Sequence, residues 1–336
     1  MDRRVSVQFL VRLCVCMAWA FVLVVPCVAQ DSVSGLGIFD ATADWGLEPE
    51  FGPKIGTNKV PGNLSITTRD GEDFYVLFGN GDRIWDRSDE GFYAYTERAG
   101  SWRIRAKLEW LDYGQDNDNL SNAGLMIRKK GFDSNSSHSY ININTPKTSK
   151  ITFNNYARIQ SGRPTIKTSR GFNKEVLKSL CLRITRLAEE KLVFSEWSLD
   201  GKQWALWTTE TVDLEDAAAY GIVITNHDDN RLLAKARFSD IHIEPAGLLI
   251  RRFFSQKKYV YPGYTLDVEM QVYNPSSSSI ITNVTETLPK GWTPVSIFSE
   301  GKINDRKLVW KDVQLVPGRT WLRYIVEIPQ KPKAWA

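Results

Sequence analysis

The chain has 336 residues, of which 42% are hydrophobic and 24% are charged, and its formal net charge is +4. This composition excludes an intrinsically disordered or collagen-like chain, and the length favours two domains. The net charge is too small to indicate a nucleic-acid-binding protein. With only three His and four Cys, the chain is poor in ligands for transition metals.

Residues 1–30 have the pattern of a secretory signal peptide. Arg3 and Arg4 give a positive start, an apolar run follows over residues 13–25, and small residues after Pro26 offer a cleavage site. The apolar run is shorter than the roughly 20 residues that a transmembrane helix needs. We therefore expect a secreted or cell-surface protein whose mature chain has no membrane span. A leader retained as a membrane anchor is the alternative.

Only one cysteine, Cys181, lies outside that segment. A single cysteine forms no internal disulfide, so the exported chain has to depend on its hydrophobic cores for stability. Cys181 lies in the strand-like run LKSLCLRITR, which predicts a buried and unreactive thiol.

The rest of the chain reads as a series of short strands. Apolar and polar residues alternate along them, as in strands with one buried face. Asp200-Gly201 has the spacing of a two-residue hairpin turn. Helical periodicity is weak: 175–182 comes closest to it, and 214–219 has room for one turn. The clearest strands, in chain order, are 102–110, 140–144, 180–186, 192–199, 220–225, 236–243, 266–272, 284–288 and 322–328.

A domain boundary is predicted near residues 245–247, where Pro, Ala and Gly follow one another. It separates a first domain at 31–247 from a second at 248–336. Many short strands with polar turns predict an all-β protein of sandwiches or barrels. The second domain has the size of an immunoglobulin-like β-sandwich but lacks the Cys…Trp…Cys pattern of antibody domains.

Several short pieces of the first domain follow one another in a distinctive order. They are 75–85, 89–95, 100–106, 123–128, 182–186, 198–204, 220–227 and 236–241. In this order the segment 36–245 resembles the concanavalin A-like lectin/glucanase (laminin G-like) superfamily, which implies a two-sheet jelly-roll sandwich. Residues 248–330, with pieces at 261–266, 284–292 and 308–310, resemble the immunoglobulin-like repeat domains of bacterial surface proteins. That second resemblance implies a spacer.

The catalytic pattern of that superfamily is not found in this sequence. Its glucanases carry an E-x-D-x-E strand that projects a nucleophile and an acid/base from one face. Here Glu109 and Asp112 have the wrong spacing, and the stretch from Glu196 to Asp200 lacks the middle acid. We therefore expect a protein that is not an enzyme. A hydrolase that assembles its carboxylates from separate strands remains a third interpretation.

Asp112, Asp116 and Asp118 lie in one loop rich in oxygen donors. Carboxylate and carbonyl oxygens are the ligands that Ca²⁺ prefers, although this loop lacks the spacing of an EF-hand. A solvated acidic loop is the alternative interpretation. Apart from this possible Ca²⁺, no cofactor is expected.

Six residues are candidates for ligand binding: Trp85, Arg128, Asn142, Trp197, Asn226 and His227. An aromatic ring stacks on the C–H face of a sugar, and Trp85 has charged neighbours that would contact hydroxyl groups. Arg128 lies on an apolar strand, where an inward guanidinium needs a partner. For each tryptophan, a place in the core is the competing interpretation.

These features favour a binding module that recognises a carbohydrate or glycan through the first domain. The alternative is a structural or adhesive scaffold whose partner is another surface protein. A fold resemblance alone does not decide between them. Exposed tryptophans beside polar side chains would favour the first interpretation.

Overall fold

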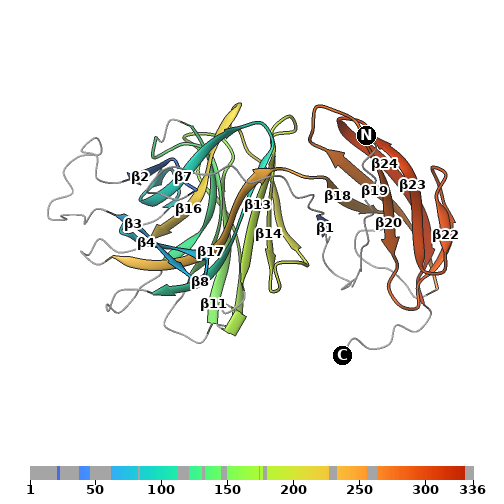
Figure 1. The fold of residues 1–336 in the computed structure, drawn as a ribbon, viewed down its shortest axis with the longest axis horizontal. Helices are drawn as coiled ribbons and strands as arrows, with labels where there is room; N and C mark the ends of the chain where they lie inside the picture. The colour runs from blue at the N-terminus through green and yellow to red at the C-terminus, as the bar shows by residue number, and fades with distance from the viewer. Residues whose placement is uncertain are drawn as a thin grey trace. The chain divides into compact units, whose positions relative to one another are not determined.

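The computed structural model describes residues 21–22, 38–45, 62–81, 84–112, 121–130, 133–144, 150–173, 175–176, 180–226, 233–255 and 263–329. The chain divides into two compact units, shown in Figure 1. The larger unit is Cys27–Ala246, and the smaller unit combines Met1–Pro26 with Gly247–Ala336. Within the described ranges, no helix is long and apolar enough to cross a membrane.

Among the described residues, the larger unit is built mainly from two antiparallel sheets of seven strands each. The order in the first sheet is β12 (Ile166–Asn173), β11 (Lys150–Arg158), β10 (His138–Asn144), β9 (Asn122–Lys129), β16 (Ala217–Thr225), β7 (Gly91–Ala99) and β2 (Ala41–Trp45). The order in the second sheet is β15 (Ala205–Thr211), β14 (Leu192–Ser198), β13 (Cys181–Leu187), β8 (Trp102–Asp112), β17 (Ala234–Pro245), β4 (Glu72–Gly79) and β3 (Asn63–Arg69).

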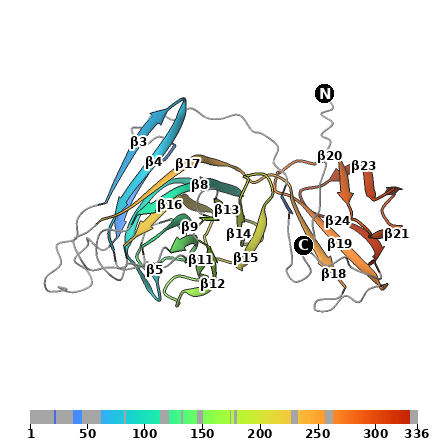
Figure 2. The same ribbon diagram turned by 90° about the horizontal axis from the view of Figure 1, so that it is seen from below.

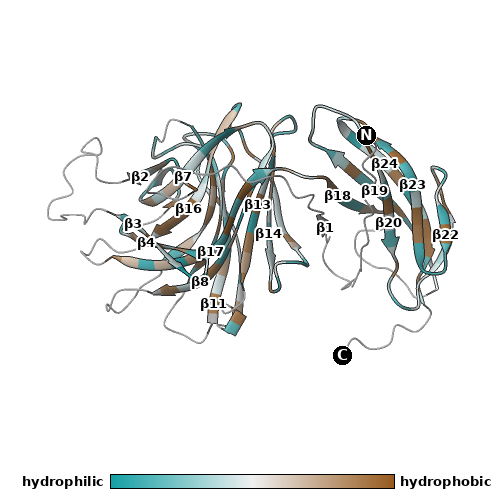
Figure 3. Ribbon diagram, in the orientation of Figure 1, coloured by the Kyte–Doolittle hydropathy of each residue, from teal (hydrophilic) through white to brown (hydrophobic). Residues whose placement is uncertain are grey.

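The core of the larger unit lies between these two sheets. Alternate residues of each strand point inward, and Ile104, Leu125, Ile141, Ile184 and Phe238 are all fully buried there. Figure 3 shows the corresponding alternation of hydrophobic and hydrophilic residues along the strands. The prediction of an all-β, two-sheet jelly-roll sandwich is confirmed.

Two local predictions were wrong. The turn at Asp200-Gly201 is longer than two residues, because β14 ends at Ser198 and β15 begins only at Ala205. Asp200 Oδ1 accepts hydrogen bonds from the backbone N–H of Gln203 (2.7 Å) and Lys202 (2.8 Å), which stabilise the wider loop and lower the pKa of Asp200. The helical turn allowed at 214–219 is replaced by strand from residue 217, because pairing with β7 and β9 outweighs the helix propensity of alanine.

The prediction for Cys181 is confirmed. The cysteine is buried at the start of β13. Burial raises the pKa of its thiol, which keeps it in the unreactive protonated form.

The smaller unit is a β-sandwich with a core of its own. One sheet has the order β1 (Phe21–Val22), β18 (Leu249–Phe254), β19 (Thr265–Asn274), β24 (Gly318–Glu327) and β21 (Thr293–Ile297), and the other has β20 (Ile280–Thr287), β23 (Lys307–Leu315) and β22 (Lys302–Asn304). Its immunoglobulin-like character stays a prediction. Of the predicted leader, only β1 belongs to the described residues, and it pairs with β18.

A buried ion pair joins the two sheets of the smaller unit. Glu286 on β20 accepts hydrogen bonds from Arg252 on β18, at 3.0 Å from Nε and 2.5 Å from the second nitrogen. The hydroxyl of Tyr324 on β24 lies 3.3 Å from Glu286 Oε1. Both charged side chains are 2% exposed, so neither charge has water as an alternative partner.

We expect Glu286→Ala to lower the free energy of unfolding of this unit by about 3–5 kcal/mol, because it removes the carboxylate that balances the buried charge of Arg252. Denaturant unfolding of the purified chain measures the change. The control is Asp267→Ala, which breaks the more exposed pair with Arg323 and should cost less than about 1 kcal/mol. Equal effects of the two substitutions would contradict this account.

Candidate functional site

The outer face of the first sheet, turned away from the second sheet, carries the candidate site. Along β10 and β11, every second side chain lies on this face, while those between them enter the core. Tyr140 pairs with Tyr156 across the two strands, and Asn142 pairs with Asn154. Polar and aromatic side chains therefore run in two adjacent rows over the same surface.

A short hairpin covers part of this face. It consists of β5 (Ile84–Trp85) and β6 (Ser88–Asp89). Ile84 and Trp85 pack with Tyr93, Met126 and Tyr140 of the sheet in a hydrophobic cluster separate from the main core. Figure 2 shows β5 beside β11 and β12.

Asp89 anchors the hairpin to the sheet through two arginines. Its carboxylate accepts two hydrogen bonds from Arg158 on β11, at 2.7 and 2.8 Å, and a third from Arg128 on β9. Arg158 also donates to the backbone oxygen of Asp86 (3.1 Å), in the turn of the same hairpin. All three charged side chains are fully buried. The hydrogen bonds between the carboxylate and the two guanidinium groups therefore take the place of hydrogen bonds to water.

His138 on β10 completes this buried group. Its Nδ1 lies 3.4 Å from Asp89 Oδ2. Burial, together with the charges of Arg158 and Arg128, lowers the pKa of His138 to about 3 against the opposing effect of Asp89, so the imidazole is neutral at pH 7. Burial alone would raise the pKa of Asp89, but the cationic groups around it lower that pKa below its ordinary value.

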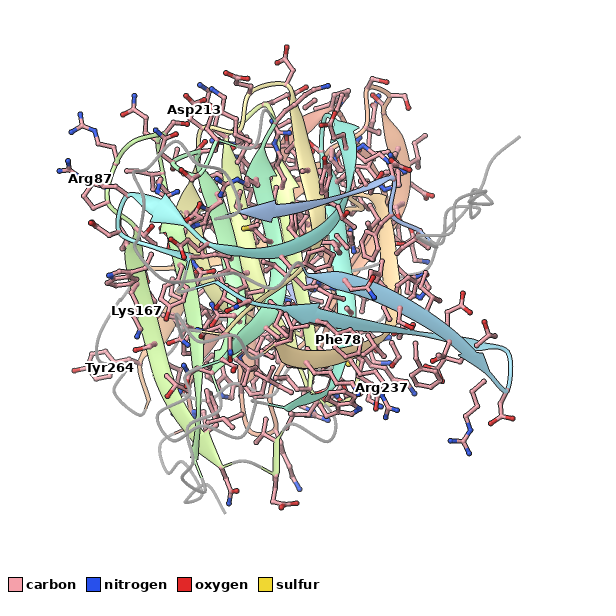
Figure 4. All side chains as sticks on the ribbon, turned by 90° about the vertical axis from the view of Figure 1, so that its left-hand side faces the viewer. Phe78, Arg87, Lys167, Asp213, Arg237 and Tyr264 are labelled. Carbon is pink, nitrogen blue, oxygen red and sulfur yellow. The ribbon has the colours of Figure 1, made fainter. Side chains whose placement is uncertain are left out.

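The hairpin presents Trp85 at the edge of this face. The ring is half-buried and meets Tyr156 edge to face, with centroids 5.4 Å apart and planes at 75°. Lys167 Nζ on β12 lies 5.9 Å from the Trp85 ring and 5.5 Å from the Tyr156 ring. We call Trp85, Tyr156 and Lys167 the Trp85 surface. Figure 4 labels Lys167 there and the exposed Arg87 of the hairpin turn.

On this outer face, three buried polar atoms have no hydrogen-bond partner among the described residues: Tyr140 Oη, Asn142 Nδ2 and Asn154 Oδ1. The two amides are joined by one bond, in which Asn154 Nδ2 donates to Asn142 Oδ1 over 3.2 Å. Buried polar groups are rarely left unpaired, because each lost hydrogen bond costs about 1–3 kcal/mol. The face therefore retains unused capacity for donors and acceptors beside an aromatic ring.

The structure brings some of the predicted site residues together and separates others. Trp85, Arg128 and Asn142 lie on the outer face of the first sheet, and the partner that Arg128 required is Asp89. Trp197 instead lies between the sheets, where its ring contacts Phe153 and Phe172.

The remaining candidates lie at the end of β16 or outside the described residues. Asn226 is buried, and its Oδ1 accepts a hydrogen bond from Ser121 (2.8 Å). His227, Asp116 and Asp118 fall outside the described residues, and Asp112 is described only as the last residue of β8. The part of the chain that is described contains no cluster of three metal-ligating side chains.

Sequence reasoning missed Asp89, His138, Arg158 and Lys167. A buried arginine implies a carboxylate partner, and that signal was present for Arg128. No signal in the sequence indicated the position of that partner, because Asp89 lies 39 residues away from Arg128. Lys167 belongs to an almost fully exposed edge strand and has no distinguishing pattern.

A cavity of about 480 Å³ lies elsewhere, near the turns that precede β14 and β16. It is lined by charged residues that already satisfy one another: Lys191 Nζ lies 3.2 Å from Asp213, and Arg186 donates to the backbone oxygens of Glu215 and Asp216. Because these charges are paired, the cavity has less capacity for a ligand than the face beside Trp85.

Comparisons with known proteins give distant structural similarity only. No protein-family model and no curated protein matches the sequence. A functionally unknown protein from Saccharomyces cerevisiae is 15% identical, covers 55% of this chain and 96% of its own, and has a TM-score of 0.41. A legume lectin-like domain from Entamoeba histolytica is 12% identical, with 56% and 90% covered and a TM-score of 0.36.

A lectin from Bauhinia forficata, solved in complex with GalNAc, is 7% identical, with 57% and 94% covered and a TM-score of 0.33. At this level of similarity, the assignment of the fold rests on the strand order of the chain itself.

The anchoring role of Asp89 predicts a large effect of its substitution. We expect Asp89→Asn to lower the free energy of unfolding of the larger unit by about 3–5 kcal/mol, because two buried arginines lose their counter-charge. Denaturant unfolding measures the loss. Asp86→Asn is the matched control in the same hairpin: its side chain is exposed, Arg158 contacts only its backbone oxygen, and asparagine tolerates its positive φ of 49°. A similar loss in both variants would refute the anchoring role.

His138 predicts a dependence of stability on pH. Between its ordinary pKa of 6.5 and about 3, the unfolded chain binds a proton at this position that the folded chain does not. Stability therefore falls as pH decreases, with a slope approaching about 1.4 kcal/mol per pH unit. Asp89 adds to the loss only near and below its ordinary value of 3.8.

Unfolding measured from about pH 6 to about pH 5 should therefore show a shallower slope in His138→Leu than in the wild type. His242→Leu is the control, because His242 is partly exposed and lies in the second sheet. Unchanged slopes in His138→Leu would show that the imidazole titrates alike in both states.

Proposed function

We propose that the larger unit is a carbohydrate-binding module and that it binds its sugar at the Trp85 surface. The observation that supports this most directly is the partly exposed Trp85 ring, which the hairpin holds in one position through Asp89. A fixed indole gives a large contact area for the C–H face of a sugar at a small entropic cost. Lys167 stands beside the ring as a hydrogen-bond donor for hydroxyl groups.

The unpaired atoms of Tyr140, Asn142 and Asn154 support the same proposal. Together they offer a hydroxyl, an amide donor and an amide acceptor, and sugar hydroxyl groups serve as both donor and acceptor. These atoms are buried, so we expect a ligand to reach them only after a local rearrangement of the site. The Trp85 ring would provide the first contact.

We propose a binding function without catalysis. A retaining or inverting glycosidase needs a carboxylic acid of raised pKa near a second carboxylate. Next to Trp85, Asp89 is bound by two arginines, which favour its charged form. In the second sheet, Glu196 is held by Arg183 at 2.8 and 2.9 Å. Glu210 has a pKa raised by burial, but it lies on β15 of that second sheet, whereas Trp85 lies on the outer face of the first.

We propose a separate role for each part of the chain. Residues 1–30 would direct export, 31–247 would bind the sugar, and 248–336 would be an immunoglobulin-like spacer at the cell surface or in a secreted protein. The separate core of the smaller unit, built around Trp310 and Leu308, supports a module that folds by itself. N-terminal sequencing of the exported protein would locate the cleavage site.

A glycan array probed with the purified 31–336 chain tests the proposal. We expect selective binding that falls by about tenfold or more in Trp85→Ala, because a stacking ring is lost. Trp321→Ala is the matched control: this tryptophan is 47% exposed on β24 of the smaller unit. Thermal unfolding would establish that both variants are folded.

Equal loss of binding in both variants, or binding that Trp85→Ala leaves unchanged, would refute the Trp85 surface as the site. An array without any binding would favour the scaffold interpretation, in which the partner is another protein. Addition of Ca²⁺ to the same array tests the loop of Asp112, Asp116 and Asp118: a gain of binding would support a calcium site there.

A further inference from the structure

The outer face of the second sheet carries a row of aromatic rings interleaved with cations. The rings are Phe74 and Phe78 on β4 and Trp110 on β8, and the cations are Lys235 and Arg237 on β17, the strand between them. Arg237 Cζ lies 5.1 Å from the Phe74 ring and 5.6 Å from the Trp110 ring. Lys235 Nζ lies 5.1 Å from the Phe78 ring and 5.3 Å from the Trp110 ring. We call these five residues the aromatic–cation ladder.

The ladder is at the surface and extends along it. All five side chains are partly exposed, and Figure 4 labels Phe78 and Arg237 on this face. Phe74 and Phe78 are four residues apart on one strand, which separates them by about 13 Å at the usual rise per residue. A single sugar or amino-acid side chain does not span this distance, so the ladder fits an extended polymer.

Neither cation of the ladder has a carboxylate within ion-pair distance in the described part of the chain, and neither side chain makes a hydrogen bond there; Arg237 Nε is a buried donor without an acceptor. Arg237 is still close enough to Glu109 that, against the opposing effect of burial, its charge adds to the hydrogen bonds from Lys107 and Ser239 in lowering the pKa of that carboxylate. Nearby Glu109 is already occupied, with Lys107 Nζ at 2.8 Å and Ser239 Oγ at 2.6 Å. Arg183 of the same sheet differs, because its guanidinium has a carboxylate partner in Glu196.

We propose that the aromatic–cation ladder binds an acidic polysaccharide composed of uronic-acid units. The rings would stack on the C–H faces of successive sugars, and the carboxylates would pair with Lys235 and Arg237. The planar guanidinium of Arg237 matches the geometry of a carboxylate. This site is separate from the Trp85 surface, because the two lie on opposite outer faces of the sandwich.

Single-stranded nucleic acid would also contact rings and cations, but the charges favour the polysaccharide. A nucleic acid carries a phosphate at every unit, and proteins that bind it present a strongly basic stripe. Here two cations alternate with three rings, and the whole chain has a net charge of only +4. This pattern fits better with a polymer that binds through stacking of its apolar ring faces as well as through its charges.

Binding of polygalacturonate to the 31–336 chain tests the proposal, with fully methyl-esterified polygalacturonate as the uncharged probe of the same backbone. We expect binding to the acid form and at least about tenfold weaker binding to the ester, since one lost charge contact is worth about a factor of ten. Binding should also weaken at about 1 M salt, where the Debye length is about 3 Å.

The variants separate the ladder from other surfaces. Lys235→Gln combined with Arg237→Gln, and separately Trp110→Ala, should each weaken polygalacturonate binding by about tenfold or more. Arg323→Gln is the matched control, because this arginine lies 4.9 Å from the Phe298 ring in the smaller unit. Thermal unfolding would identify any variant that has lost its fold, and the charge variant keeps the test valid if Trp110→Ala does not fold.

Three results would overturn the proposal: no binding of polygalacturonate, equal binding of the ester, or unchanged binding in the charge variant. Tighter binding of oligothymidylate than of polygalacturonate would assign the ladder to nucleic acid instead. Trp85→Ala should leave polygalacturonate binding intact, so failure of the ladder and failure of the Trp85 surface are distinguishable.

Discussion

The contact between Asp89 and two arginines determines the architecture of the candidate site. A single buried carboxylate joins a two-stranded hairpin to β9 and β11, and its three hydrogen bonds cross between segments far apart in the sequence. Burying these charges costs free energy, and removing one partner from the buried group costs free energy as well. The group therefore fixes the position of the hairpin, while its net contribution to stability is small. The same contact fixes the position of Trp85, because Trp85 lies four residues before Asp89 in this hairpin.

The two outer faces of the sandwich use charge in different ways. On the first sheet, arginines are fully buried and matched with a carboxylate, and the surface that results is a partly exposed ring beside one lysine. On the second sheet, the cations of β17 are matched with rings in place of carboxylates. A ring leaves most of the charge of a cation available to other groups, whereas a carboxylate neutralises it.

Alternation of side chains predicted the strands and therefore the sandwich, and the apolar context of Arg128 predicted a buried partner. The features that failed depend on contacts between distant strands. Trp197 was a ligand candidate, but its side chain faces the core together with Val193 on the same strand. The ladder combines β4, β17 and β8, which are neighbours in space and not in sequence. Asp200 shows a local limit, since its carboxylate lengthens a turn whose spacing predicted two residues.

The sheet order has a consequence for how the chain folds. In the first sheet β16 lies between β9 and β7, and in the second β17 lies between β8 and β4. Both sheets are therefore incomplete at their centres until the last strands of the larger unit are available. Pairing over such sequence separations carries a high entropic cost of loop closure and makes folding slow. During synthesis, the first two hundred residues cannot close the sandwich, and they would remain accessible to a chaperone until β16 and β17 are synthesised.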